Sequence, residues 1–296
     1  MIGSGMDASL VSGLDLRFLS GQKQVRTGRV TGRGLQPDEM GLQARDHGLS
    51  LLFEWGHRPD AAGIAALASE CGEFAVSHDG TRTGEHATAD GKGSDLEWVE
   101  LLANGLTFDL WGLTPGPAAQ IPECTYTFDL ADDFRPEGCE ALWLAPGPHL
   151  AGGERMMPVI RTIVGLAAGL CQLPGLVAVV WHPARSGVGP VYFSSIVSNW
   201  LEGGVFPGLG LVGLATVADG GMQSEGVAFF TGQEIRIEPE LADDRATAAK
   251  IAVRLIDHLV TGGPLDRVVE LSGPQGRLLR IEPSANGRFV RVWSAG

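Results

Sequence analysis

The stretch TIVGLAAGLCQLPGLVAVV, residues 162–180, is almost entirely apolar and decides which class of fold the chain can adopt. Its length approaches that of a transmembrane helix. However, Pro174 and Gly175 would break a helix, and the valine-rich run after them is typical of a β-strand. We therefore expect a buried helix, a tight turn and a central strand within the core of a soluble protein.

The composition of the whole chain agrees with a soluble globular protein. Its 296 residues are 44% hydrophobic and 19% charged, and the formal net charge is -13. Phosphate backbones and anionic lipid surfaces carry charge of the same sign and would be repelled. We expect neither nucleic acid nor a membrane as a partner.

The cysteines and the N-terminal residues bear on the compartment. The four cysteines form no CxxC pair and no zinc-type spacing, and residues 1–10 show no basic and apolar secretion signal. Free thiols in a reducing environment are the simplest interpretation. We expect a cytoplasmic protein without a metal or a cofactor.

Hydrophobic periodicity predicts alternating strands and helices on both sides of the opening stretch. Upstream, the expected elements are strands at 49–55, 74–77, 106–113 and 126–130, a helix opening at Pro59 and ending at Gly72, and a helix at 94–105 with a capping box at Ser94 and Glu97. Downstream, they are strands at 140–146, 176–182, 209–217, 225–230, 233–239, 267–273, 277–283 and 288–293, and helices at 155–172, 191–201 and 243–260. This order predicts an α+β protein with mainly antiparallel sheets.

Two segments suggest an internal duplication. LLFEWGHRPD at 51–60 and AVVWHPARSG at 178–187 both place Trp, His, Pro and Arg after an apolar strand. The elements that follow each segment can be read as a βαββαβ, ferredoxin-like unit. We predict a polar N-terminal arm at 1–48, a first unit with its connection at 49–138 and a second unit at 139–296. Coincidence is the alternative, because apolar strands often end in polar loops.

Familiar catalytic motifs are missing from the sequence. It contains no GxSxG, HExxH or GxGxxG pattern, and DGKGSD at 90–95 lacks the spacing of a phosphate-binding loop. Possible metal ligands gather at His78, Asp79, Glu85 and His86, without the spacing of a known site. We interpret both segments as solvated loops.

The loop after the strand at 176–182 is the best candidate site. Arg185 could hold a carboxylate or phosphate through two hydrogen bonds, Ser186 could complete the anion site, and His182 could titrate near neutral pH. In the structural alternative, Trp181 packs in the core and Arg185 pairs with a carboxylate of the protein. His57 and Arg58 are the weaker, equivalent candidates in the first half.

The second half resembles an uncharacterised bacterial family, domain of unknown function 4261. The segments that carry the resemblance are VVWHPARS, WLEGG, SEGVAFFTGQEI and SANGRFVRVW, within the last half of the chain. The resemblance implies no reaction and no site residues.

Two classes of function remain. The first is a non-catalytic binding or protein-interaction module, whose partner is an unknown protein or a small anionic ligand. The second is an enzyme acting on a small anionic substrate, with His182 as acid or base and Arg185 as the anion clamp. Convergence of Trp181, His182 and Arg185 in one pocket would favour the enzyme.

Overall fold

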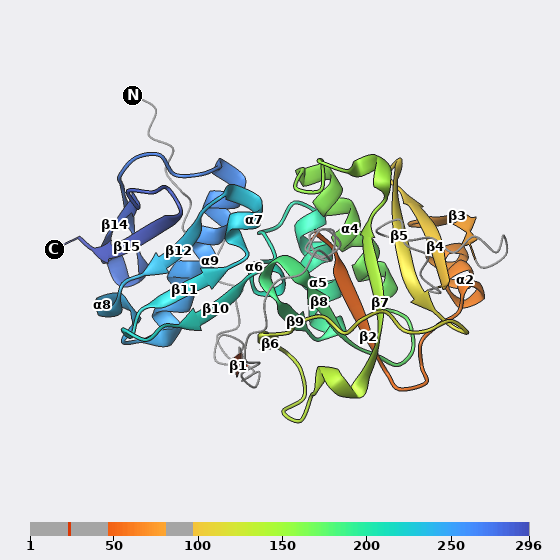
Figure 1. The fold of residues 1–296 in the computed structure, drawn as a ribbon. Coiled ribbons are helices and arrows are strands. Elements are labelled where there is room, and N and C mark those ends of the chain that lie inside the picture. The colour runs from red at the N-terminus through yellow and green to blue at the C-terminus, as the bar shows by residue number, and fades with distance from the viewer. Residues whose placement is uncertain (1–22, 25–46, 81–96, 296) are drawn as a thin grey trace, which may run out of the picture.

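Two β-sheets lie side by side in the protein, each with helices against it (Figure 1). The computed structural model describes residues 23–24, 47–80 and 97–295. The larger sheet has nine strands in the order β1-β6-β9-β8-β2-β7-β5-β4-β3. Its strands are β1 (Lys23–Gln24), β2 (Leu49–Glu54), β3 (Ala75–Asp79), β4 (Glu97–Ala103), β5 (Leu106–Leu113), β6 (Tyr126–Phe128), β7 (Cys139–Pro146), β8 (Leu176–Trp181) and β9 (Ser186–Val188).

Three helices cover one face of this sheet: α2 (Ala61–Cys71), α4 (Met157–Leu170) and α5 (Pro190–Leu201). Leu49 and Leu51 of β2 share a core with Ile64 of α2, Ile160 of α4 and Phe193 of α5. The opposite face carries a second apolar cluster beneath the segment between β5 and β7, which contributes Ala119 and Cys124. The sheet is therefore buried on both faces at its centre.

The smaller sheet has six strands in the order β10-β11-β12-β15-β14-β13. Its strands are β10 (Gly213–Thr216), β11 (Met222–Glu225), β12 (Glu234–Ile237), β13 (Val269–Ser272), β14 (Leu278–Pro283) and β15 (Phe289–Ser294). The long helix α9 (Arg245–Gly262) packs on one face of it, accompanied by the short helices α6 (Gly208–Leu211), α7 (Val227–Thr231) and α8 (Pro239–Ala242). Short 3₁₀ turns occur at η3 (Pro136–Gly138), η4 (Pro148–Leu150), η5 (His182–Ala184) and η6 (Pro274–Gly276).

The apolar stretch at 162–180 adopts the predicted helix, turn and strand. It begins inside α4, turns at Pro174 and Gly175, and continues as β8 in the centre of the larger sheet. None of the helices among the described residues is long and apolar enough to cross a membrane. The mixed α and β composition with mainly antiparallel sheets is likewise confirmed, because β6–β9 and β12–β15 are the parallel pairs among the strands described.

The helix predicted at 94–105 is wrong over its described part. Residues 97–103 form β4, which pairs with β5 through a two-residue turn at Asn104 and Gly105. Both turn residues have positive φ, 50° and 76°, the conformation that matches the twist of a hairpin. Alternate burial of Val99, Leu101 and Ala103 agrees with a strand.

The strand predicted at 225–230 is also wrong beyond its first residue. The strand β11 ends at Glu225, and residues 227–231 form α7. The carboxylate of Glu234 on β12 accepts hydrogen bonds from the backbone N–H groups of Gly226 (2.8 Å) and Ala228 (3.0 Å). A tertiary contact therefore caps this helix, which explains why local sequence gave no sign of it.

The ferredoxin-like duplication is not confirmed. The strands that precede the two similar loops, β2 and β8, are antiparallel neighbours in one sheet, and Leu49 pairs with Trp181. The boundary predicted at residue 138 falls between β5 and β7, which also pair with each other. Both β2 and β8 are apolar on both faces, so each requires a central position, and one sheet provides it for both.

Candidate functional site

The face of the larger sheet that lies away from its helices carries three tryptophans, and we call it the tryptophan face. Trp98 pairs in register with Trp111, Trp111 with Trp143, and Trp143 with Ser50. Residues paired in this way share one face and lie in one row across the strands. The rings of Trp111 and Trp143 stack with centroids 4.7 Å apart.

A second row on the same face combines acidic and very small side chains. Glu100 pairs with Asp109, and Asp109 with Ala145. A Cβ on Gly48 would lie 3.3 Å from that of Ala145 and 2.7 Å from Nε1 of Trp143, so glycine is required there. The N–H of His182 donates to the carbonyl of Gly48 at 3.2 Å. Asp109 and His182 therefore lie in this row on either side of Ala145 and Gly48.

Asp109 is a buried carboxyl group without a hydrogen-bond donor among the described residues. Only 5% of the residue is exposed. Burial, with a smaller contribution from the charge of Glu100, raises the pKa of Asp109 to about 7. The Glu100 carboxylate itself accepts a hydrogen bond from the Ser77 hydroxyl at 2.6 Å. Burial therefore favours the protonated form of Asp109.

Two indole N–H groups on the tryptophan face also lack a hydrogen-bond partner among the described residues. Nε1 of Trp111 and Nε1 of Trp143 are buried and have no acceptor in the described part of the chain. Buried polar groups in proteins are ordinarily hydrogen-bonded, and an unpaired group costs about 1–3 kcal/mol. A bound molecule with hydrogen-bonding groups would remove this cost.

His182 contacts the tryptophan face through Ser50, a residue that the sequence pattern did not indicate as a site residue. Oγ of Ser50 lies 2.9 Å from Nε2 of His182, and Ser50 is buried in the middle of β2. A serine hydroxyl at this distance from an imidazole has the spacing of a nucleophile and its base. The same contact also satisfies the hydrogen-bonding requirement of a buried serine.

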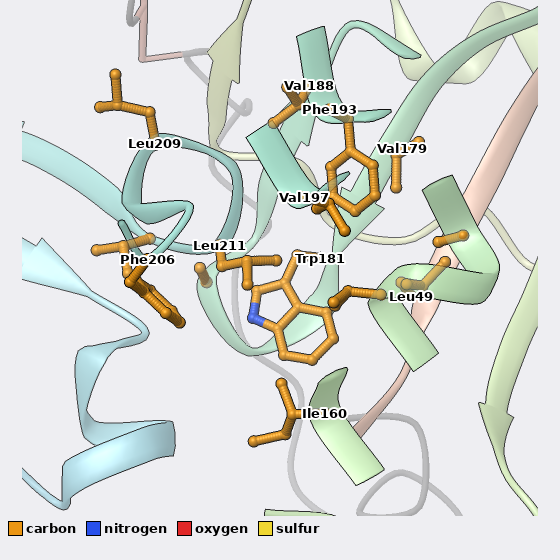
Figure 2. Close-up of a cluster of buried hydrophobic side chains, with 14 of the residues drawn as sticks. Leu49, Ile160, Val179, Trp181, Val188, Phe193, Val197, Phe206, Leu209 and Leu211 are labelled. Atoms are coloured by element: carbon orange, nitrogen blue, oxygen red, sulfur yellow. The ribbon is translucent and has the colours of Figure 1, made fainter. Parts of the chain in front are cut away.

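Trp181, although adjacent to His182, points into the helix-covered face. Its side chain lies among Leu49, Ile160, Phe193 and Val197 (Figure 2). Phe229 of α7 packs edge-on against it with ring centroids 5.5 Å apart. Trp181 thus has the packing role that the structural alternative predicted.

Ser186 lies directly opposite Trp181 in the pairing of β8 with β9. Both the Ser186 hydroxyl and the Trp181 Nε1 are buried without a partner among the described residues. Ser186 therefore does not share the tryptophan face with His182.

Arg185 is occupied by carboxylates of the protein itself, which corrects its predicted role as an anion clamp. Its Nε and Nη2 donate to the two oxygens of Glu225 at 2.6 and 2.8 Å, and its Nη1 donates to Glu123 at 2.6 Å. These contacts raise the pKa of Arg185. The hydroxyl of Tyr126 donates to Glu225 at 2.7 Å. Arg185 thereby links the larger sheet to β11 of the smaller one.

His57 and Arg58 lie at the other end of the larger sheet, because β2 and β8 are antiparallel. Arg58 is buried; it donates to the carbonyls of Gly112 and Gly116 and lies 3.1 Å from Glu140. His57 is exposed and lines a cleft of about 520 Å³. The structure therefore does not bring the two predicted loops into one site.

Other hollows and clusters are less informative. A cleft of about 590 Å³ lies between α4 and α5, with Ser194, Ser198 and Arg161 in its lining. The described residues contain no group of three side chains suited to a metal ion, and Glu85 and His86 of the predicted cluster lie outside these residues.

Sequence reasoning missed Ser50, Asp109, Trp111 and Trp143. The available signal was Asp109 itself, a single acidic residue inside the apolar strand LTFDLWGL. Its distance of two residues from Trp111 places both on one face of a strand. The register that adds Trp143 and Ser50 is a tertiary property.

Comparison of the chain with protein-family models, with curated proteins and with solved structures found no match.

Proposed function

We propose that the protein is a non-catalytic binding module that holds a small neutral molecule on the tryptophan face. The observation that carries this proposal is that Trp111 Nε1 and Trp143 Nε1, both buried and unpaired among the described residues, lie beside the buried residue Asp109 at neighbouring positions of one sheet. Such groups are expected where a bound molecule supplies the missing partners.

The chemistry of these groups restricts the ligand. An indole N–H can only donate, and a carboxyl group with a pKa about 7 can accept or donate near neutral pH. A hydroxyl or an amide offers both an acceptor and a donor, whereas an anion would be repelled by Asp109 and by the net charge of -13. A polyol or an amide therefore fits better than the small anion expected from the sequence.

Calorimetric titration with a panel of neutral polyols and primary amides tests the proposal. We expect a member of the panel to bind, and Trp143→Phe, which removes one N–H and keeps an aromatic ring, to weaken it about 10-fold. Trp181→Phe is the matched control, because it removes an unpaired indole N–H from the other face of the sheet. Equal loss of affinity in both variants, or no binding to the unmodified protein, would count against the site.

An enzyme is the second candidate, and the contact between Ser50 and His182 is the observation that favours it. In this reading Ser50 is the nucleophile and His182 the base, while Arg185 no longer serves as the clamp. Hydrolysis of 4-nitrophenyl acetate by the protein should then disappear in Ser50→Ala and persist in Ser186→Ala. A rate that is the same in both variants would eliminate this candidate.

A further inference from the structure

An exposed tryptophan follows the last residue of β2. Trp55 is 77% exposed, although tryptophan is a residue that proteins usually cover. A large aromatic side chain held in solvent is a frequent feature of protein-interaction surfaces, where tryptophan contributes more binding energy than most residues.

The turn that presents Trp55 is fixed on both sides. The N–H of Glu54 donates to the carbonyl of Gly175 at 2.9 Å, and the N–H of Gly56 donates to Glu140 at 2.7 Å. Arg58 holds the next part of the turn against Gly112 and Glu140. A rigid turn loses little conformational freedom when a partner binds, so it favours association.

The turn also borders the 520 Å³ cleft, whose lining is acidic. Its ionisable lining residues are His57, Asp60, Glu70 and the buried, ion-paired Arg58. Glu54, which is exposed, lies 3.8 Å from His57 on the same turn. Within the described structure, Glu70 has no cationic partner, and the carboxylate of Asp60 accepts only from the N–H of Gly63. The cleft beside Trp55 therefore offers unneutralised negative charge.

We propose that Trp55 and this cleft form a docking surface for a basic, arginine-bearing segment of a protein partner. A guanidinium group pairs with carboxylates and stacks on the face of an indole, so a segment that carries arginine matches both features of the surface. Acidic ligands would be repelled. This docking surface is independent of the ligand proposed for the tryptophan face, since the two use different residues at different places on the sheet.

A pair of synthetic peptides tests the docking surface. One peptide is acetylated and amidated and carries arginines separated by glycine and leucine; the other has glutamate in place of each arginine. Calorimetric titration should show binding of the arginine peptide alone, weakened by added salt. Trp55→Ala should weaken it about 30-fold, as expected for a central aromatic contact.

Matched carboxylate variants distinguish docking from general attraction to an acidic protein. Glu70→Gln should weaken the arginine peptide several-fold, whereas Glu270→Gln, an equivalent change at an exposed residue of the smaller sheet, should leave its affinity unchanged. Trp55 is exposed, so Trp55→Ala should keep the melting temperature of the unmodified protein.

Three results would overturn the proposal. They are failure of the arginine peptide to bind the unmodified protein, equal binding by Trp55→Ala, and equal weakening by Glu70→Gln and Glu270→Gln. Analytical ultracentrifugation adds a fourth: a dimer that dissociates in Trp55→Ala would assign this surface to a second copy of the chain.

Discussion

At the scale of single residues, Asp109 determines how the stability of the protein should depend on pH. Its carboxyl group lies in β5 beside the stacked tryptophans, and burial holds its pKa at about 7, against an ordinary value of 3.8. Between these two pH values the folded protein keeps a proton that the unfolded chain has released. The free energy of unfolding should therefore fall as the pH rises from about 4 to about 7.

Asp109→Asn should remove this dependence, because an amide does not titrate. The variant should match the unmodified protein near pH 4 and be more stable at pH 8, by an amount on the order of 4 kcal/mol at most. Urea unfolding at intervals between pH 4 and pH 8 measures the difference. A stability difference that stays constant over this range would show that Asp109 does not titrate as described.

At the scale of elements, the hairpin of β4 and β5 depends on the conformation of its turn. Asn104 and Gly105 both adopt positive φ, which costs a residue with a side chain about 1–2 kcal/mol. Asparagine tolerates this conformation better than most residues, and glycine adopts it without strain. The pair Asn104-Gly105 therefore favours a hairpin over the helix that the capping pattern predicts.

Gly105→Ala should destabilise the protein by about 1 kcal/mol for a conformational reason alone. A Cβ at this position would meet no atom within 4 Å, so steric contact cannot contribute. Gly105→Asn should cost less, because asparagine accepts positive φ. Thermal unfolding of the two variants tests this order, and an equal loss in both would mean that another feature sets the turn.

At the scale of the whole molecule, the segment from Trp181 to Arg185 joins the two sheets. Trp181 packs against Phe229 and stacks with Phe230, and Arg185 binds Glu225 of β11 with two hydrogen bonds. His182, between them, contacts Ser50 on the tryptophan face. One short segment therefore contacts the candidate site, the helix-covered core and the smaller sheet.

Arg185 contributes to this joint in two opposing ways, which two substitutions can separate. Its ion pairs stabilise the joint, although partial exposure limits an ion pair to about 1 kcal/mol. In contrast, its φ of 49° is unfavourable for an arginine and free of strain for glycine. Arg185→Ala should lose the ion pairs and keep the strain. Arg185→Gly should lose both and be about 1 kcal/mol more stable than Arg185→Ala in urea unfolding. The reverse order would contradict this account.

The sequence alone determined the features that depend on neighbouring residues. Pro174 and Gly175 divide the apolar stretch into helix and strand because a proline and a glycine interrupt a helix wherever they occur. The helix predicted at 243–260 forms as α9, Arg245–Gly262, and Asp244 is its N-cap. These elements carry their own starting and stopping signals.

Only the tertiary structure decided which strands are neighbours. The pairing of the strands in turn determines which residues form the candidate site. Asp109, Ser50 and His182 lie far apart in the chain and share a face because β5, β7, β2 and β8 pair in one register. The same pairing sends Arg185 to Glu225 instead of into a pocket. Strand pairing joins residues at any separation along the chain, and the burial of Asp109 depends on the strands around it. The sequence pattern of a single segment therefore predicts neither the pairing nor the burial.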